Sequence, residues 1–222
     1  MIWDNEVARE VWPRLMGGLQ ITVKVTLLAT AIALLFGLLL AMLQRSRRPA
    51  VRRVSYWVLE SIRRTTLLIQ LFFAFYVLPE MGIMLDGMVC GVIVLGLHVG
   101  SYMAEVYRAG IDAVPKGQWE AARALNLTPR ATWVCVILPQ AIPPMVPALG
   151  NYFVMMFKES ALLSTIAVLD LMGEARLFAN ETYRYIEPMT LVGLIFLAIS
   201  IPSAIALRYL ENRIAKSDRL SA

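Results

Sequence analysis

Residues 112–139 read DAVPKGQWEAARALNLTPRATWVCVILP, a polar stretch between long apolar runs, and this pattern decides how the whole chain is interpreted. Pro115 is expected near the first position of a helix, where a proline loses no internal hydrogen bond. Asn126 is expected to end that helix, because Asn often replaces Gly where a helix closes with a left-handed residue. Thr128 and Pro129 then match an N-cap and the first residue of a second helix. The stretch is therefore predicted to fold as helix, turn and helix, although a plain loop between two membrane spans is the simpler alternative.

The apolar runs on either side of this stretch indicate an integral membrane protein. The 222 residues are 59% hydrophobic, and the mean hydropathy is +0.64. About 20 consecutive apolar residues cross a bilayer as a helix. The sequence therefore predicts an all-α membrane protein with five transmembrane helices, at residues 19–43, 54–78, 88–109, 142–157 and 189–207.

The second of these spans is interrupted by charge. Glu60, Arg63 and Arg64 lie inside it, and charges at mid-membrane are costly. We therefore expect residues 56–64 to form a helix at the cytoplasmic interface and residues 65–78 to cross the membrane.

The fourth span contains three prolines near its start. Pro143, Pro144 and Pro147 leave carbonyl groups that other groups must satisfy, which predicts a bend or an irregular entry. Residues 161–172 follow it and are apolar but too short to span, so they are expected to form a short helix that caps a cavity.

The placement of the basic residues predicts the topology. Of the 21 Lys and Arg, seven lie in residues 45–64, four in 108–130 and four in 208–219. The positive-inside rule puts these three segments in the cytoplasm, so the N-terminus is expected outside and the C-terminus in the cytoplasm. The formal charge of +5 does not indicate a nucleic-acid partner, because the arginines flank apolar runs in contact with lipid.

These boundaries divide the chain into three parts. Residues 1–17 are predicted to form an N-terminal interfacial segment with tryptophan anchors. Residues 18–210 are predicted to form the transmembrane domain, with the polar stretch 112–139 as a cytoplasmic loop, and residues 211–222 a cytoplasmic tail.

Motifs for chemistry are not legible in the sequence. It has no G-x-x-x-x-G-K-[ST] for a nucleotide, no HExxH or CxxC for a metal, and no Ser/His/Asp set for hydrolysis. We therefore expect no catalytic residues, no metal site and no cofactor in this chain. Cys90 and Cys135 fall at opposite ends of the predicted topology and are expected to be buried, inert thiols.

The polar stretch also carries a resemblance. Glu120, Ala121 and Ala122, followed by a turn residue and then by ILP at residues 137–139, resemble the EAA motif of permease subunits in binding-protein-dependent ABC importers. Asn126 stands where the motif usually has glycine, and both residues tolerate the left-handed cap.

This resemblance implies the type I importer permease fold and a set of partners. The EAA segment would be the coupling helix that docks into a pair of ATP-binding subunits, which would hold ATP and Mg²⁺. A second permease subunit, either a copy or a paralogue, and an extracytoplasmic solute-binding protein would complete the complex. The implied location is the bacterial plasma (inner) membrane, in contact with lipid.

The resemblance extends to a branch of the family. Residues 18–30, 69–73, 105–111, 138–151 and 157–164 resemble the branch for polar amino acids. Residues 126–153 and 181–197 are most similar to permease subunits for ectoine and hydroxyectoine. The implied solute is a small zwitterion, either a polar amino acid or ectoine.

Two groups of residues are candidates for the solute pathway. His98, Tyr102 and Glu105 are spaced four and three apart, so they share one face of a helix. A lone intramembrane histidine is more often a hydrogen-bonding group between helices, and Glu105 could equally pair with Arg108.

The second group lies on the fourth span. Asn151 follows its prolines, and Lys158 and Glu159 at its end offer both charges that a zwitterion needs. Equally, these two charges could mark the membrane interface.

Two other classes of function remain as alternatives. A self-contained secondary transporter usually has paired repeats and more spans, and no repeat is visible here. A non-transporting membrane scaffold would not need a folded polar segment such as residues 112–139.

Overall fold

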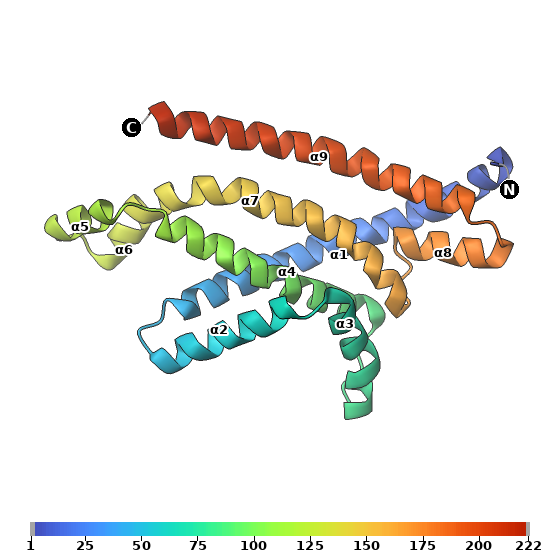
Figure 1. The fold of residues 1–222 in the computed structure, drawn as a ribbon, viewed down its shortest axis with the longest axis horizontal. Helices are drawn as coiled ribbons and strands as arrows, with labels where there is room; N and C mark the ends of the chain where they lie inside the picture. The colour runs from blue at the N-terminus through green and yellow to red at the C-terminus, as the bar shows by residue number, and fades with distance from the viewer. Residues whose placement is uncertain (1–2, 221–222) are drawn as a thin grey trace.

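The computed structural model describes the backbone of residues 3–220 and the side chains of residues 3–214. The predicted N-terminal segment begins with residues 1–2 and the predicted C-terminal tail finishes with residues 221–222. These four residues lie outside the described residues. All regular structure in the described part is helical, as Figure 1 shows, so the predicted all-α class is confirmed. The α-helices are α1 (Asn5–Gln44), α2 (Pro49–Arg64), α3 (Leu67–Phe72), α4 (Gly87–Asp112), α5 (Lys116–Ala124), α6 (Pro129–Ala131), α7 (Leu138–Glu159), α8 (Leu171–Thr182) and α9 (Ile186–Leu220).

Several of these helices continue into turns of another pitch. A π-helical segment, Phe73–Val77, and a 3-10 turn, Leu78–Met81, extend α3. The π-helical segment Thr132–Ile137 joins α6 to α7, and the 3-10 turns Ser160–Ile166 follow α7.

Four of the helical segments in the described chain are long and apolar enough to cross a membrane. They are Asn5–Gln44, Gly87–Asp112, Pro129–Ile166 and Ile186–Ile214. The helices Pro49–Arg64 and Leu67–Met81 form a pair bent by 101°, and they make a fifth span if they count as one. The predicted spans therefore correspond to four long helices and one broken one.

The centre of the assembly is the contact between α1 and α4. Small residues on both helices let the two backbones approach closely. A Cβ atom built on Gly37 of α1 would lie 2.7 Å from the carbonyl oxygen of Gly100 of α4. One built on Gly100 would lie 3.0 Å from the carbonyl oxygen of Ala33. This is the small-residue packing by which membrane helices associate without a hydrophobic driving force.

The N-terminal segment is not a separate element. It is helical from Asn5 and continuous with the first span, so no break in the helix marks the predicted boundary at residue 17. Val11 and Leu15 are fully buried against Leu171 and Phe178 of α8. In the same way α9 continues through residue 210 without a break.

The predicted break in the second span is confirmed. Thr65 and Thr66 have extended backbones between α2 and α3, with ψ values of 141° and 137°. The helix before the break begins at Pro49, seven residues earlier than the predicted start at residue 56.

The prolines of the fourth span do not interrupt it. Pro143, Pro144 and Pro147 all lie inside α7, and the irregular part comes earlier, in the π-helical turns Thr132–Ile137. The predicted irregular entry is therefore present, but it lies upstream of the prolines.

The short helix predicted at residues 161–172 was wrongly placed. The structure has 3-10 turns to Ile166, a left-handed residue at Ala167 with φ 61°, and then α8 from Leu171. Asp170 sets this start, because its Oδ1 accepts a hydrogen bond of 2.9 Å from the Gly173 backbone N–H. Burial raises the pKa of the Asp170 carboxyl to about 6. The apolar composition of residues 161–172 did not reveal this cap.

The close contact of α1 and α4 predicts the effect of a single methyl group. We expect Gly37→Ala to lower the free energy of unfolding by about 1–3 kcal/mol, because the added carbon meets a backbone oxygen that cannot rotate away. Gly17→Ala on the same helix is the matched control, since its added carbon meets nothing within 4 Å. Thermal unfolding of the purified chain in detergent measures both, and a Gly37→Ala protein as stable as Gly17→Ala would contradict the packing.

Candidate functional site

The broken second span brings polar side chains together inside the helical assembly. They come from α2, α3, α4 and α7, and most are partly buried. We call this group the polar cluster, and its members are Glu60, Arg63, Gln70, His98, Tyr102, Glu105 and Tyr152.

An arginine at the end of α2 links two helices within the polar cluster. Arg63 pairs with Glu60 on its own helix, and its Nη1 lies 3.5 Å from Oε1 of Glu105 on α4. Arg108, one turn further along α4, donates from Nε to Oε2 of Glu105 over 3.0 Å. Side chains of Glu60, Arg63 and Glu105 remain 13–27% exposed, so the charges are shielded but still accessible to a solute.

The amide of Gln70 closes the break between α2 and α3. Its Nε2 donates to the carbonyl oxygen of Ile62 over 2.7 Å and to Oγ1 of Thr65 over 2.5 Å. Its Oε1 lies 3.1 Å from Nδ1 of His98 on α4. The carbonyl groups left free by a broken membrane helix are satisfied in this way by a side chain.

Aromatic rings line the cluster on the side of α4 and α7. The ring centroids of His98 and Tyr102 are 5.4 Å apart. Tyr102 stacks on Tyr152 of α7 with centroids 6.0 Å apart and an interplanar angle of 27°. The Tyr102 hydroxyl also donates to the carbonyl oxygen of Arg63 over 3.4 Å, so the rings and the ion pairs form one connected group.

This arrangement suits a small solute that carries both charges. A guanidinium binds a carboxylate, and a carboxylate or an aromatic face binds a cation. Charged groups, rings and a helix break at one place in a membrane protein are features of transporter binding sites.

A second arrangement with a defined geometry is the α5–α6 hairpin, residues 116–131. Asn126 has φ 50°, the left-handed value predicted for it. The Leu127 N–H donates to the carbonyl oxygen of Ala122, and the Asn126 N–H to that of Arg123, both over 3.0 Å. These two bonds form a Schellman cap. Thr128 then caps α6, as predicted, by accepting a bond of 3.3 Å from the Ala131 N–H.

The α5–α6 hairpin presents one face of α5 outward. Trp119 meets Trp133 of the π-helical segment edge to face, with centroids 5.3 Å apart. On the same side Ala122 is only 2% exposed. Glu120 and Ala121 are exposed, and the Leu125 side chain at the end of α5 is 73% exposed.

Comparison with known families identifies the chain. Residues 33–216 match the family model described as the binding-protein-dependent transport system inner membrane component. The chain belongs to this family of ABC transporter permeases. Members work with ATP-binding subunits, a second permease subunit and a binding protein.

Individual relatives place the permease in the amino-acid branch. It is 38% identical to a probable amino-acid ABC transporter permease protein of Sinorhizobium fredii, over 96% of this chain and 95% of that one. It is also 38% identical to a probable glutamine ABC transporter permease protein of Bacillus subtilis, over 86% and 91%. An L-cystine transport system permease protein of the same organism is 34% identical, over 96% and 93%.

Solved structures agree with this assignment. A crystal structure of an amino acid ABC transporter with histidines matches with a TM-score of 0.90 and 37% identity, covering 96% of the permease and 100% of that chain. An inward-facing structure of the MetNI methionine ABC transporter matches with a TM-score of 0.76 and 18% identity, over 90% and 96%, and supports the fold alone. The permease thus has the all-helical type I fold.

The structure separates the two groups of predicted pathway residues. His98, Tyr102 and Glu105 share one face of α4 and join the polar cluster. Asn151 is exposed on α7, although its neighbour Tyr152 belongs to the cluster. Lys158 and Glu159 are the last two residues of α7, and Lys158 is exposed.

Sequence reasoning missed three members of the polar cluster. Glu60 and Arg63 were assigned to the cytoplasmic interface, and Gln70 was not considered. The interruption of an apolar run by charges was the available signal, because ionisable residues inside a membrane usually face a binding site.

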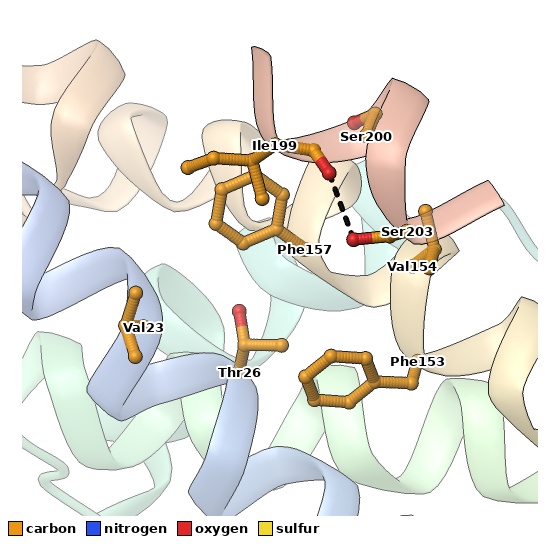
Figure 2. A pocket seen from close by; sticks show the side chains of 8 residues that line it. All are labelled: Val23, Thr26, Phe153, Val154, Phe157, Ile199, Ser200 and Ser203. Atoms are coloured by element: carbon orange, nitrogen blue, oxygen red, sulfur yellow. Dashed lines mark hydrogen bonds between the residues drawn. The ribbon is translucent and has the colours of Figure 1, made fainter. Parts of the chain in front are cut away.

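The cavity in Figure 2 suits a zwitterion less well than the polar cluster does. It lies between α1, α7 and α9 and has a volume of about 110 Å³. Its polar groups are the hydroxyls of Thr26, Ser200 and Ser203, and Ser203 already donates to the Ile199 carbonyl oxygen over 2.7 Å. The other lining residues are apolar: Val23, Phe153, Val154, Phe157 and Ile199. No charged side chain within the described part of the chain lines it.

The two cysteines of the permease differ in exposure. Cys90 is buried in the core, as predicted, but Cys135 on the π-helical segment is exposed, so the prediction of burial was wrong for it. The burial preference of cysteine does not say which side of a helix the residue occupies, and Cys135 lies on the exposed side of its segment together with Val134.

Proposed function

We propose that the permease forms the membrane pathway of an ATP-driven importer for a small zwitterionic solute. The observation that supports this most is the polar cluster at the broken helix of a chain in the amino-acid branch of the family. A pair of ATP-binding subunits would hold ATP and Mg²⁺, so the permease itself is not an enzyme. A second permease subunit, a copy or a paralogue, and an extracytoplasmic binding protein complete the importer in the bacterial inner membrane.

The solute is proposed to be a polar amino acid or the related zwitterion ectoine or hydroxyectoine. Arg63 would bind the carboxylate, while Glu105 and the rings of Tyr102 and Tyr152 would bind the positive group. Names of relatives include glutamine and cystine, which favours a polar amino acid. Resemblance of residues 126–153 and 181–197 to ectoine permeases keeps ectoine as the second candidate.

The orientation is proposed to be N-terminus outside and C-terminus in the cytoplasm. The two ends of the chain lie at opposite ends of the assembly in Figure 1, and the C-terminal end shares its side with α5. The turn between α1 and α2, with five arginines in residues 45–53, lies on the same side of Figure 1 as the α5–α6 hairpin, which is where the positive-inside rule expects the cytoplasmic face. Division of the chain at residues 17 and 210 remains a prediction.

Coupling to the ATP-binding subunits is proposed to run through the α5–α6 hairpin. Glu120 and Ala121 lie on its exposed face, and Asn126 holds the turn that shapes it. Ala122, the third residue of the motif, is only 2% exposed within this chain, so its proposed role is to let α5 pack closely behind the exposed face.

The exposed face of α5 predicts which substitutions uncouple the importer. Ala121→Asp and Glu120→Lys should abolish uptake and solute-stimulated ATP hydrolysis, because an unpaired charge buried in an interface costs about 3–5 kcal/mol. Both proteins should still reach the membrane, since Glu120 and Ala121 are exposed and substitutions at exposed positions usually change stability little. Ala113→Asp, at an exposed alanine just before the hairpin, is the control. Normal uptake by both α5 variants in the reconstituted complex would remove the coupling role.

The proposed orientation predicts a pattern of chemical labelling. In a chain whose Cys90 and Cys135 are replaced, Asn180→Cys should react with an impermeant maleimide added to intact cells. Gln118→Cys should react only after the membrane is opened. Both native side chains are exposed, so accessibility depends on the side of the membrane. Labelling of Gln118→Cys from outside would reverse the topology.

The polar cluster predicts where the solute binds. Glu105→Gln should reduce solute uptake by the reconstituted importer about ten- to hundredfold, the effect of losing one charged hydrogen bond. Lys158→Gln and Asn151→Leu, at the other candidate group, are the comparison. If these two lose uptake while Glu105→Gln keeps it, the solute binds at the far end of α7 and the polar cluster is structural.

A further inference from the structure

Four arginines near the start of α2 have no ion-pair partner among the side chains that the structure describes. Arg47, Arg48, Arg52 and Arg53 are exposed, and none forms an ion pair with another side chain in residues 3–214. Their neighbours in sequence are paired, because Arg45 contacts Asp112 and Arg64 contacts Glu60. Four uncompensated positive charges within seven residues create a strong local attraction for anions.

An exposed apolar strip lies next to these arginines on α2. The side chains of Val54 and Trp57 are 64% and 62% exposed, and Val58 is 40% exposed. Their spacing of three and four residues places them on one face of the helix. They line a shallow groove that also includes Arg53, Ser61 and Ile62.

The opposite face of α2 packs against the rest of the protein and so keeps the apolar strip exposed. Leu59 is fully buried against Leu40 of α1 and Ala104 of α4, and Ser55 is buried beside it. The helix therefore cannot turn its apolar strip inward without breaking this packing. In Figure 1 the start of α2 lies beside the end of α1, towards the side of the assembly where α5 is found.

Along α2 the arginines come first and the apolar strip follows, which matches the change from headgroups to acyl chains at a membrane interface. An apolar strip of this kind is stable among acyl chains, and a tryptophan prefers the level of the headgroups. Arginine guanidinium groups bind phosphate oxygens with two parallel hydrogen bonds. Each basic residue near an anionic membrane surface contributes about 1 kcal/mol of attraction.

We propose that the first turns of α2 form a binding site for anionic phospholipids. Arg47, Arg48, Arg52 and Arg53 bind the headgroup phosphates, and the acyl chains cover Val54, Trp57 and Val58. The occupant is a phospholipid with net negative charge, since a zwitterionic headgroup offers its own cation in competition with the arginines.

This site adjoins the segment proposed to couple the permease to its partners. Arg45 holds the end of α1 to Asp112, the last residue of α4 before the α5–α6 hairpin, with Nη1 and Oδ1 2.5 Å apart. A lipid bound to Arg47 and Arg48, which follow Arg45 in the same turn, would hold this junction of α1 and α4 in place. Lipid binding itself needs only that the permease lies in a membrane, so it does not depend on the identity of the solute.

The test compares two lipids on the purified full-length permease in a neutral detergent. Dioleoylphosphatidylglycerol and dioleoylphosphatidylcholine are titrated separately, and bound lipid is counted by native mass spectrometry. We expect a clear preference for phosphatidylglycerol that weakens as salt is raised. Arg52→Gln with Arg53→Gln should lower the affinity for phosphatidylglycerol about tenfold or more and leave that for phosphatidylcholine unchanged.

A matched double variant controls for charge alone. Arg123→Gln with Arg130→Gln removes two exposed arginines of the α5–α6 hairpin and should leave the lipid preference intact. Thermal unfolding without added lipid shows that each variant is folded. Trp57→Ala should weaken the binding of both lipids, because it shortens the apolar strip.

Four outcomes would overturn the proposal. The first is equal binding of the two lipids, and the second is an equal loss of preference in the two double variants. The third is displacement of phosphatidylglycerol by an equal concentration of inorganic phosphate, which would indicate a free-anion site. If Trp57→Cys instead forms a disulfide with a second copy in native membranes, the strip is an interface between subunits and no lipid covers it.

Discussion

The contact between α1 and α4 is the constraint on which the other helices depend. Gly37 and Gly100 let two long helices approach until their backbones touch, and side chains larger than these would push them apart. With the two helices so close, α4 can present one face to the broken second span and another to α7. Small residues thus replace the hydrophobic effect, which offers no drive for association among lipid tails.

The break after Arg64 brings the charged residues of the second span into the polar cluster. An unbroken helix through Glu60, Arg63 and Arg64 would carry three charged side chains into the membrane, which is costly even when they pair within the helix. Here the chain stops after Arg64, turns by 101° and continues as α3. Glu105 of α4 compensates Arg63, and Gln70 satisfies the carbonyl of Ile62. The groups that stabilise the break are the same ones that could recognise a zwitterion, so structure and proposed binding share one set of side chains.

The short motif in the α5–α6 hairpin contains both buried and exposed residues. Trp119 packs against Trp133 of the π-helical segment and Ala122 is buried, whereas Glu120 and Ala121 are exposed. Adjacent alanines in the motif therefore have different physical roles. Ala122 is buried within its own chain, and Ala121 lies on the surface that a partner can reach.

The sequence by itself determined the helical class, the positions of the spans, the break near residue 65 and the left-handed turn at Asn126. These follow from local rules: apolar run length, the cost of isolated charges, and the backbone preferences of Asn and Pro. Only the tertiary structure decided that Arg63 meets Glu105, that Ala122 faces inward and that Asp170 starts α8. Each of these depends on which helix lies beside which, and that is set by contacts between residues far apart in the chain, for which local pattern contains no information.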